Sequence, residues 1–375
     1  MPPKLRYPGH TPRRAAVIGG GSFGTAVAIL LERAGVRTTL VCRTHEQAAR
    51  LNTDGHNGHY LPGVRLPAGL RVRALDDQDD QFRRSDLVFI AVPSNGMGAA
   101  LEQISHLGVA DSAGIVSLAK GLVGPEGTSP SVALERAFGP ERTARVGGPA
   151  HAREMVESGA GLVCASHSEA LAHRVAEVFQ GAGVVCEVSD DPVGAELAGV
   201  AKNAAAVAVG ATQAQGLNAA GMAAADIFLE VLALAERSGG KARTFVGRSG
   251  TGDLVATALA PSSRNRSAGE LLAGGVPGVE IPGRLGQAVE ALETVPLLAV
   301  ALKRSGLAAP VVSALGRLID GSLPLDDWVR LVRAKQPAPA RFGRPGTWWG
   351  RVKAWFSGAP HREGRERPQL VSGDD

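Results

Sequence analysis

Lys202 is the residue whose type and surroundings most strongly indicate chemistry. It stands with Asn203 in "ELAGVAKNAAAVAVGA", where nearly every neighbour is Ala, Val or Gly. A strongly hydrated side chain is thus placed on an element that the pattern predicts to be buried. The lysine either completes a buried ion pair, with Glu196 or Asp253 as its partner, or acts as an acid, a base or a stabiliser of an oxyanion with a lowered pKa.

A second polar group lies further along the chain. Asp253 follows the glycines of "GTGDL", and "SSRNRSAG" then supplies Ser263, Arg264 and Asn265. Guanidinium, amide and hydroxyl donors in one segment are what a phosphorylated small molecule requires. The simpler interpretation of this segment is a polar loop that caps a helix. If it binds phosphate, it holds the substrate at a point remote from Lys202 and so orients it.

The glycines near the N-terminus predict a dinucleotide site. In "AAVIGGGSFGTAVAILLERAG" the pattern GxGxxG is formed by Gly19, Gly21 and Gly24. Such glycines permit a tight turn, close approach of a pyrophosphate and packing of a helix on a strand. A strand is expected over residues 15–18 and a helix over residues 23–33, so the glycines fall within a β-α-β unit.

Residues beside this unit are expected to contact the phosphate groups of a dinucleotide. Ser22 and Phe23 fall at the predicted helix N-terminus, where backbone N–H groups and the helix dipole favour a phosphate. After the next strand, "TTLVCR", NAD-specific sites usually place an acidic partner for the ribose hydroxyls, but this chain has Arg43. A cation there tolerates a 2′-phosphate, so NADP is favoured over NAD alone as the cofactor.

The elements that must position these residues alternate along the first half of the chain. Apolar strand candidates begin at residues 70, 86, 114, 161 and 184, several of them separated by helix-like segments. This alternation predicts a mostly parallel sheet. Beyond Asp190 long helices take over, including "PGRLGQAVEALETVPLLAVALKRSG". The predicted fold class is α/β, an N-terminal Rossmann doubly wound sheet followed by an all-helical C-terminal domain.

The same pattern predicts four segments: a basic leader at 1–14, a Rossmann NAD(P)-binding domain at 15–190, a helical substrate-binding domain at 191–333 and a basic, flexible tail at 334–375. In the tail, "TWWGRVKAWF" fits an amphipathic helix that touches anionic lipid weakly. Its few apolar residues and Gly350 favour the simpler interpretation, a segment that packs on the protein or a partner or stays disordered.

Composition predicts a cytoplasmic protein. The basic N-terminus lacks the apolar run of a signal peptide, and no uninterrupted stretch reaches the ~20 apolar residues of a membrane span. Cys42, Cys164 and Cys186 are scattered in apolar runs, which favours buried thiols over disulfides or a metal site. Of the net charge of +4, residues from Arg333 onward carry +5 and the remainder −1, which argues against a nucleic-acid partner.

Taken in order, the motifs resemble one enzyme family. They run from about Ala15 to Gly321 as "GGGSFGTA", "NGHYLPGVRLP", "SDLVFIAVPS", "SLAKGL", "GGPAHARE", "ELAGVAKN", "GTGDL", "SSRNRSAG" and "GQAVEAL". The set resembles the soluble NAD(P)-dependent glycerol-3-phosphate dehydrogenases, most closely the bacterial form. The resemblance implies hydride exchange between dihydroxyacetone phosphate and glycerol 3-phosphate, a precursor of glycerophospholipids, with NADP or NAD as cofactor. It is also compatible with a homodimer.

The resemblance implies residue roles as well. Lys202 matches the family's catalytic lysine, Lys120 its assisting lysine, and Asp253 would orient the ammonium or a hydroxyl. The substrate-binding positions are Lys120, Gly148, Ala150, Lys202, Asn203, Asp253, Ser263, Arg264 and Asn265. The cofactor positions are Gly19, Gly21, Ser22, Phe23, Gly24, Arg43, Lys120, Gly148, Ala152, Arg264 and Glu290. No metal is implied.

Departures from the family pattern leave alternatives open. The family usually reads GPSFA where this chain has "GPAHA", and Arg248 and Ser249 stand in a loop that is normally apolar. One alternative is a related β-hydroxyacid-type dehydrogenase that acts on a carboxylate, and another is a non-catalytic NAD(P) sensor. The SRNR and LPG segments favour the phosphate ester. The intact lysines and Asp253 argue against the sensor.

Overall fold

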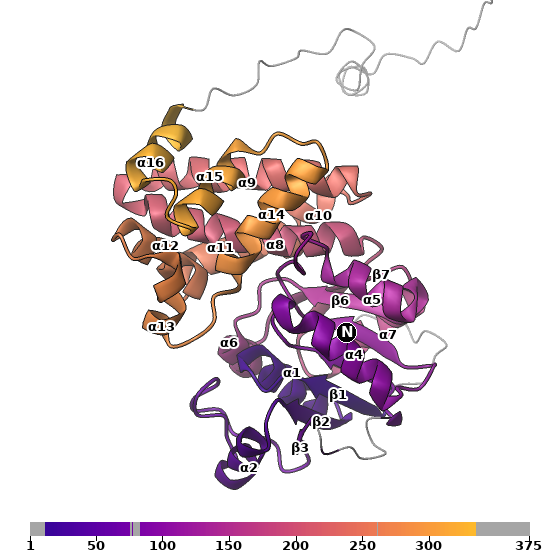
Figure 1. Cartoon of the computed structure of the whole chain (residues 1–375). Coiled ribbons are helices and arrows are strands. Elements are labelled where there is room, and N and C mark those ends of the chain that lie inside the picture. Colours follow the sequence, from indigo (N-terminus) through magenta and orange to yellow (C-terminus); the bar gives the residue numbers. More distant parts are fainter. Residues whose placement is uncertain (1–11, 76, 78–82, 261, 335–375) are drawn as a thin grey trace, which may run out of the picture. The chain divides into compact units, whose positions relative to one another are not determined.

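The computed structural model describes residues 12–75, 77, 83–260 and 262–334, and its strands form one sheet (Figure 1). The strands are β1 (Arg14–Ile18), β2 (Arg37–Cys42), β3 (Arg71–Ala74), β4 (Leu87–Ile90), β5 (Gly114–Ser117), β6 (Thr143–Gly147), β7 (Gly161–Ser166) and β8 (Val185–Ser189). Their order is β3-β2-β1-β4-β5-β6-β7-β8, and neighbours are parallel except β6 and β7. The order of the first six is that of a doubly wound Rossmann sheet, which confirms the predicted fold class.

Strand β6 was not among the predicted strands. Its sequence, TARVG, is short and has the fully buried Arg145 at its centre, so it lacks the apolar run that marks the other strands. It is also the point where the sheet changes direction, because β7 runs antiparallel to it. Because β6 ends at Gly147, it is the element that positions Gly148, and the sequence pattern did not reveal it.

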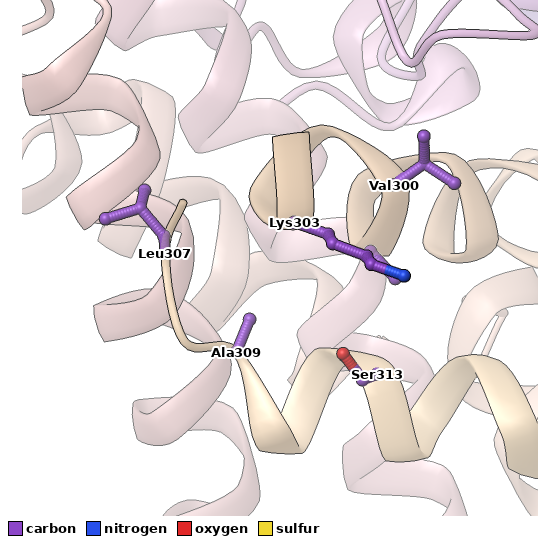
Figure 2. Close-up of a pocket in the computed structure, with 6 residues that line it drawn as sticks. Val300, Lys303, Leu307, Ala309 and Ser313 are labelled. Carbon is purple, nitrogen blue, oxygen red and sulfur yellow. The ribbon is translucent and has the colours of Figure 1, made fainter. Parts of the chain in front are cut away.

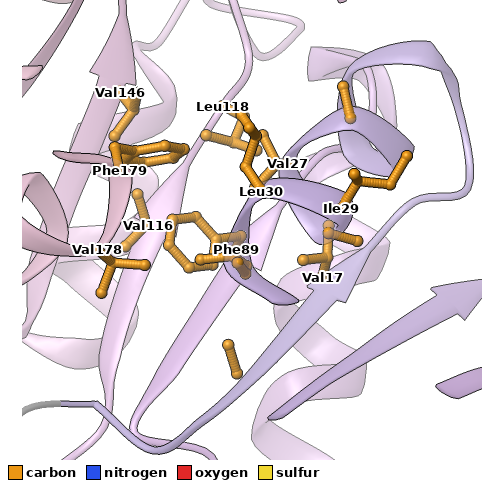
Figure 3. Packing of buried hydrophobic residues seen from close by; sticks show 14 of the residues in the cluster. Val17, Val27, Ile29, Leu30, Phe89, Val116, Leu118, Val146, Val178 and Phe179 are labelled. Carbon is orange, nitrogen blue, oxygen red and sulfur yellow. The ribbon is translucent and has the colours of Figure 1, made fainter. Parts of the chain in front are cut away.

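Helices cover both faces of the sheet. They are α1 (Ser22–Arg33), α2 (His45–Asp54), α4 (Met97–Leu107), α5 (Pro130–Phe138), α6 (Ala152–Glu157) and α7 (Glu169–Gly181), with short 3-10 turns η1 (Ser94–Gly96) and η2 (Pro140–Arg142). Because side chains alternate along a strand, Val17 and Phe89 pack with α1 and α7, whereas Ile18 and Ile90 face α4. In the first of these cores the ring of Phe89 meets that of Phe179 edge-on at 6.0 Å (Figure 3).

The second half is helical, as predicted. It contains α8 (Pro192–Thr212), η3 (Gln213–Gln215), α9 (Leu217–Arg237), α10 (Ala242–Val246), η4 (Arg248–Gly252), α11 (Asp253–Leu259), α12 (Arg264–Ala273), η5 (Gly278–Glu280), α13 (Ile281–Leu285), α14 (Glu290–Arg304), α15 (Pro310–Ile319) and α16 (Leu325–Ala334). The run from Pro282 to Gly306, predicted as one helix, is two. Gly286, at φ +64°, ends α13, so α14 begins only at Glu290.

The domain boundaries stay predictions. The last strand ends at Ser189 and α8 begins at Pro192. Most of the predicted leader (1–14) and nearly all of the predicted tail (334–375), including "TWWGRVKAWF", lie outside the described residues.

Helices α8 and α12 approach each other backbone to backbone. A Cβ atom on Gly210 of α8 would collide with the carbonyl oxygen of Arg266, and one on Gly269 of α12 would collide with that of Val207. Two glycines thus remove the side chains that normally separate packed helices. The contact places the start of α12 at a fixed distance from the middle of α8.

The core contains the apolar helix α9 and all three cysteines. By length and composition α9 can cross a membrane, yet Ala223, Ile227 and Val231 pack into the core of the helical half. The cysteines are buried free thiols, as predicted. Burial raises the pKa of Cys42 to about 11 and that of Cys186 to about 12, so both stay protonated at neutral pH.

A surface pocket of about 340 Å³ lies beside α14 and α15 (Figure 2). It is lined by Ala299, Val300, Lys303, Leu307, Ala309 and Ser313. None of these residues belongs to the predicted site, to which α14 contributes only Glu290 at its other end.

Candidate active site

Helix α8 carries Lys202 into the protein interior. Asp191 caps the helix by accepting a hydrogen bond from the backbone N–H of Gly194 at 2.8 Å, and Pro192 occupies the first turn. Alanine, the best helix former, then dominates the buried middle of the helix. Lys202 is only 7% exposed there, as the apolar surroundings in the sequence predicted.

Asp253 joins the two lysines that the sequence singled out. Its Oδ1 lies 3.4 Å from Lys202 Nζ, and its Oδ2 lies 2.8 Å from Lys120 Nζ. The carboxylate stands at the first position of α11, directly after the π-helical turn η4, and is 2% exposed. Of the two partners considered for Lys202, Asp253 is therefore the one in contact, while Glu196 accepts hydrogen bonds from Ser131.

Lys120 connects this pair to the predicted dinucleotide turn. It follows β5, donates to the carbonyl oxygen of Gly148 at 3.1 Å and lies 5.8 Å from the ring centroid of Phe23. A lysine over an aromatic face is stabilised by a cation–π interaction. Gly148 has a φ of +110°, which only glycine adopts readily, so the backbone after β6 can turn back toward the ammonium.

Thr257 is a site residue that the sequence analysis missed. Lys202 Nζ donates to its hydroxyl oxygen at 3.1 Å, and the hydroxyl lies 3.4 Å from Asp253 Oδ1. Its spacing of four residues from Asp253, which places both on one face of α11, is the signal that could have revealed it. Lys202, Asp253 and Thr257 thus form one buried hydrogen-bonded group.

The side chains of Asn203 and Asn265 extend the hydrogen-bonded network from Lys120 to the start of α12. Asn265 Nδ2 donates to Asn203 Oδ1 at 2.7 Å, and Asn203 Nδ2 donates to the carbonyl oxygen of Lys120 at 3.0 Å. Ser263 caps α12, as the simpler interpretation of its segment had it, by accepting from the N–H of Arg266. Arg264 is not drawn into the cluster. It is exposed, and its guanidinium donates to the carbonyl oxygen of Ala288 at 3.0 Å.

Burial and neighbouring charges set the protonation of this group. Burial, aided by the charge of Lys120, lowers the pKa of Lys202 to about 8, and Asp253 opposes both effects. Burial raises the pKa of Asp253, but the charges of Lys120 and Lys202 outweigh it, so that pKa lies below its usual value. Lys202 can therefore exchange a proton in the neutral to alkaline range while Asp253 stays ionised.

The turn between β1 and α1 has the clearances that a dinucleotide requires. Gly19 has a φ of +117°, and a Cβ there would lie 2.6 Å from the carbonyl oxygen of Ala91. A Cβ on Gly24 would collide with the carbonyl oxygen of Gly19, whereas Gly21 has no atom within 4 Å of its Cβ position. The first and third glycines are thus required by the fold, and the second leaves open space at the N-terminus of α1, where a pyrophosphate fits.

The other predicted cofactor residues, and Ala150 of the predicted substrate-binding set, differ in exposure and in their contacts. Ser22 Oγ donates to the carbonyl oxygen of Tyr60 at 2.6 Å. Arg43 is exposed directly after β2, so its guanidinium is accessible to a phosphate. Glu290 Oε1 accepts from the N–H of Ser94 at 3.1 Å, which joins the start of α14 to the end of the β4 segment. Ala152 begins α6, and Ala150 packs against the sheet core.

The residues that depart from the family pattern make contacts of their own. His151 Nε2 lies 3.4 Å from the carbonyl oxygen of Ala256 on α11. Arg248 pairs with Glu187 on β8, beside a pocket of about 560 Å³ that Ser249 also lines. Within the described ranges, no group of three His, Cys, Asp or Glu side chains could hold a metal ion.

Two family models match the chain. The model described as the N-terminus of NAD-dependent glycerol-3-phosphate dehydrogenase matches residues 14–172, and the model of its C-terminus matches residues 191–330.

Individual proteins give the same result. The glycerol-3-phosphate dehydrogenase [NAD(P)+] of a Parafrankia species is 36% identical over 333 residues, which is 87% of this chain and 98% of that protein. One from Thermus thermophilus is 33% identical over 86% of this chain and 99% of its own length. Among solved structures, glycerol-3-phosphate dehydrogenase from Coxiella burnetii superposes with a TM-score of 0.79 at 26% identity, covering 87% of this chain and all of that one.

Proposed function

Because the chain belongs to the NAD-dependent glycerol-3-phosphate dehydrogenase family, we propose that it interconverts dihydroxyacetone phosphate and glycerol 3-phosphate with NADP or NAD. The observation that carries the proposal is the pair of lysines on Asp253. One of them, Lys202, is buried and has a pKa of about 8, while the other is a second cation 2.8 Å from the same carboxylate. A reaction that creates and removes an alkoxide needs both an exchangeable proton and a nearby positive charge.

Lys202 acts as the acid in the reducing direction. Its ammonium stabilises the alkoxide that develops on the central carbon and then donates the proton to it. In the oxidising direction the neutral amine accepts that proton. Asp253 Oδ1 and Thr257 Oγ1 lie 3.4 and 3.1 Å from the Nζ atom, and these two contacts orient it toward the substrate.

The β1–α1 turn holds the dinucleotide. Gly21 and the N–H groups that begin α1 would hold its pyrophosphate, and the exposed Arg43 would be available to the 2′-phosphate of NADP. When bound, the nicotinamide ring supplies or accepts the hydride. Lys120, which lies 5.8 Å from the Phe23 ring centroid and 2.8 Å from Asp253, would place a positive charge next to both ligands.

The start of α12 binds the phosphate of the substrate. Asn265 is already oriented by Asn203, and Arg264 supplies a guanidinium that can form two parallel hydrogen bonds to phosphate oxygens. Both lie at a helix N-terminus, which favours an anion. This donor set supports a phosphate ester over the carboxylate of a β-hydroxyacid.

A spectrophotometric assay with purified protein tests the function. Dihydroxyacetone phosphate should be reduced with NADPH, and with NADH comparably or less well. Lys202→Met keeps side-chain length and apolar packing but loses the acid, so turnover should fall by at least ~10²-fold while the protein still folds and binds NADPH. Lys303→Met, on the exposed end of α14, is the matched control and should retain activity. A folded Lys202→Met variant with near wild-type turnover would refute the assignment.

The proposal also covers the cellular location and the oligomeric state of the enzyme. A cytoplasmic enzyme of this kind supplies glycerol 3-phosphate for glycerophospholipid synthesis, and we expect it to be a homodimer. Cell fractionation tests the location. Light scattering coupled to gel filtration tests the assembly, and a mass of 38.5 kDa, that of one chain, would contradict the dimer.

A further inference from the structure

Asp253, which contacts both lysines of the site, begins α11 directly after the turn η4, and this turn is rich in glycine. Gly250 and Gly252 lie within it, and Gly247 precedes it. Glycine gives a segment conformational freedom, so the position of Asp253 depends on what fixes the turn. The turn is a π-helix, a rare form that is frequent at functional sites.

Two contacts within the helical half fix part of the turn. Thr251 Oγ1 donates to the carbonyl oxygen of Phe245 at 3.0 Å, and a Cβ on Gly250 would collide with that same oxygen. The turn therefore packs closely on the end of α10. Neither contact reaches the strands, from which Lys120 comes.

Arg248, the first residue of η4, connects the turn to the sheet. Its carbonyl oxygen accepts a hydrogen bond from the backbone N–H of Asp253, so the two residues are joined directly. Its guanidinium pairs with Glu187 on β8. Between these two ends the stem of the side chain passes the start of β7, because a Cβ on Gly161 would lie 3.3 Å from Arg248 Cδ and 3.7 Å from Pro149 Cγ.

Pro149 belongs to the segment that supports Lys120. It follows Gly148, whose carbonyl oxygen accepts from Lys120 Nζ at 3.1 Å. A Cβ on Gly252, the last residue of η4, would lie 3.9 Å from both Arg248 Cβ and Pro149 Cγ. The turn η4 and the segment that supports Lys120 therefore meet beside Arg248.

We propose that Arg248 is a positioning residue, which pairs with Glu187 and thereby fixes the turn that carries Asp253. Held in this way, the carboxylate stays within reach of both lysines. The inference rests on the proposed roles of Lys202 and Asp253 in the reaction. It concerns this chain in particular, since Arg248 is one of the residues that depart from the family pattern.

The ion pair can be removed without loss of the fold. The side chains of Arg248 and Glu187 are 40% and 53% exposed and line the pocket of about 560 Å³. An ion pair as exposed as this one contributes little to stability. Arg243 on α10 pairs with Asp190 at 3.1 Å and lines the same pocket, but it lies outside η4, so it provides a matched control.

The test compares Arg248→Met, Glu187→Gln, the double variant that combines Arg248→Glu with Glu187→Arg, and Arg243→Met. Methionine keeps most of the stem and removes the ion pair, whereas the double variant restores an ion pair of reversed sign. The values of kcat and KM and the melting temperature are measured for each. Titration of ¹³C-labelled lysine side chains in the ligand-free protein, with the Lys202 signal assigned from Lys202→Met, monitors the site without reference to catalysis.

In Arg248→Met and in Glu187→Gln we expect kcat for the reduction of dihydroxyacetone phosphate to fall about three- to tenfold, because Asp253 is less well placed. The KM for NADPH should change by less than about twofold, since the dinucleotide turn is not altered. The double variant should recover most of the wild-type kcat, and Arg243→Met should retain it.

The pKa of Lys202 should fall by roughly half a unit in Arg248→Met, because in the wild type the Asp253 carboxylate opposes the lowering by burial. Lys120 and Glu290, the other charged groups that act on Lys202, are the same in all variants. Loss of the positive charge of Arg248 alone would raise this pKa, so the sign of the shift separates positioning from a direct effect of charge.

The inference requires both changes in Arg248→Met. An unchanged kcat, an unchanged lysine titration or a rise in the pKa of Lys202 would each overturn it, as would a lower melting temperature alone. A double variant as impaired as the two single variants would show that the ion pair is not what holds the turn. If the titration shifts as expected but Lys202→Met stays active, the assignment of Lys202 fails instead.

Discussion

At Lys202 one proton is expected to set the pH dependence of both directions of the reaction. Its pKa is lowered to about 8, first by burial and then by Lys120. Reduction needs the ammonium, so its turnover should be constant below pH 8 and fall above it. Oxidation needs the amine, so its turnover should rise through the same pH. Turnover measured in both directions at saturating substrate should give mirror-image curves, and midpoints that differ by more than about one unit would contradict a shared group.

At Arg43 the expected effect is on the choice of cofactor. The side chain is exposed after β2, where a carboxylate would accept from ribose hydroxyls and repel a 2′-phosphate. Arg43→Asp should therefore move the ratio of kcat/KM for NADPH to that for NADH toward NADH by about tenfold or more. Arg50→Asp, on the exposed side of α2, is the control for charge. An unchanged ratio in Arg43→Asp would show that this side chain lies away from the adenosine ribose.

At the level of elements, two glycines of the β1–α1 turn are expected to serve different purposes, Gly24 in folding and Gly21 in cofactor binding. Gly24→Ala should prevent stable folding or lower the melting temperature strongly, because the new methyl group meets the carbonyl oxygen of Gly19, which the backbone cannot move aside. Gly21→Ala adds the same group where nothing lies within 4 Å, so the fold should persist while the KM for the dinucleotide rises. Circular dichroism melts and cofactor titrations distinguish the two. Equal melting temperatures for Gly24→Ala and Gly21→Ala would contradict the argument that only Gly24 is required for packing.

Most elements could be predicted because their apolar periodicity reports directly on burial. The strand 87–90 and the helix α8 are nearly pure apolar runs, and both are found. Strand β6 could not be predicted, since a buried arginine interrupts its pattern. The division between α13 and α14 was missed because it depends on a left-handed conformation at Gly286, one of many glycines in the chain.

The candidate site was predictable where a residue was out of place in its segment. Lys202 drew attention as a cation among alanines, and the structure brings it to Asp253. Thr257 was missed because a single threonine on a helix is unremarkable until its contacts are known. Arg264 was predicted as a phosphate ligand, a role that stays a prediction, since in the structure it binds the carbonyl oxygen of Ala288.

At the scale of the whole molecule, the site joins the sheet half to the helical half. Lys120 comes from the sheet half, whereas Lys202 and Asp253 come from the helical half. Ligands that bind this junction should stabilise both halves together, by ~2.7 kcal/mol at 100 times Kd. NADP should therefore raise the melting temperature, and glycerol 3-phosphate should raise it further. Calorimetry that shows no shift with either ligand would argue against a site at this junction.

The backbone contact between α8 and α12 fixes the distance between these two helices. Gly210 and Gly269 fix how far the start of α12 stands from Lys202, and neither helix can move closer or retreat without disturbing that contact. With the proposed roles of Lys202 and of the start of α12, a ketose phosphate with one more carbon between carbonyl and ester is expected to lose contact with either its proton donor or its phosphate ligands. We therefore expect the spacing of these two helices to set the selectivity for chain length. Changing the preferred length of the substrate would therefore require substitutions at Gly210 and Gly269, two residues that have no side chain with which to contact any ligand.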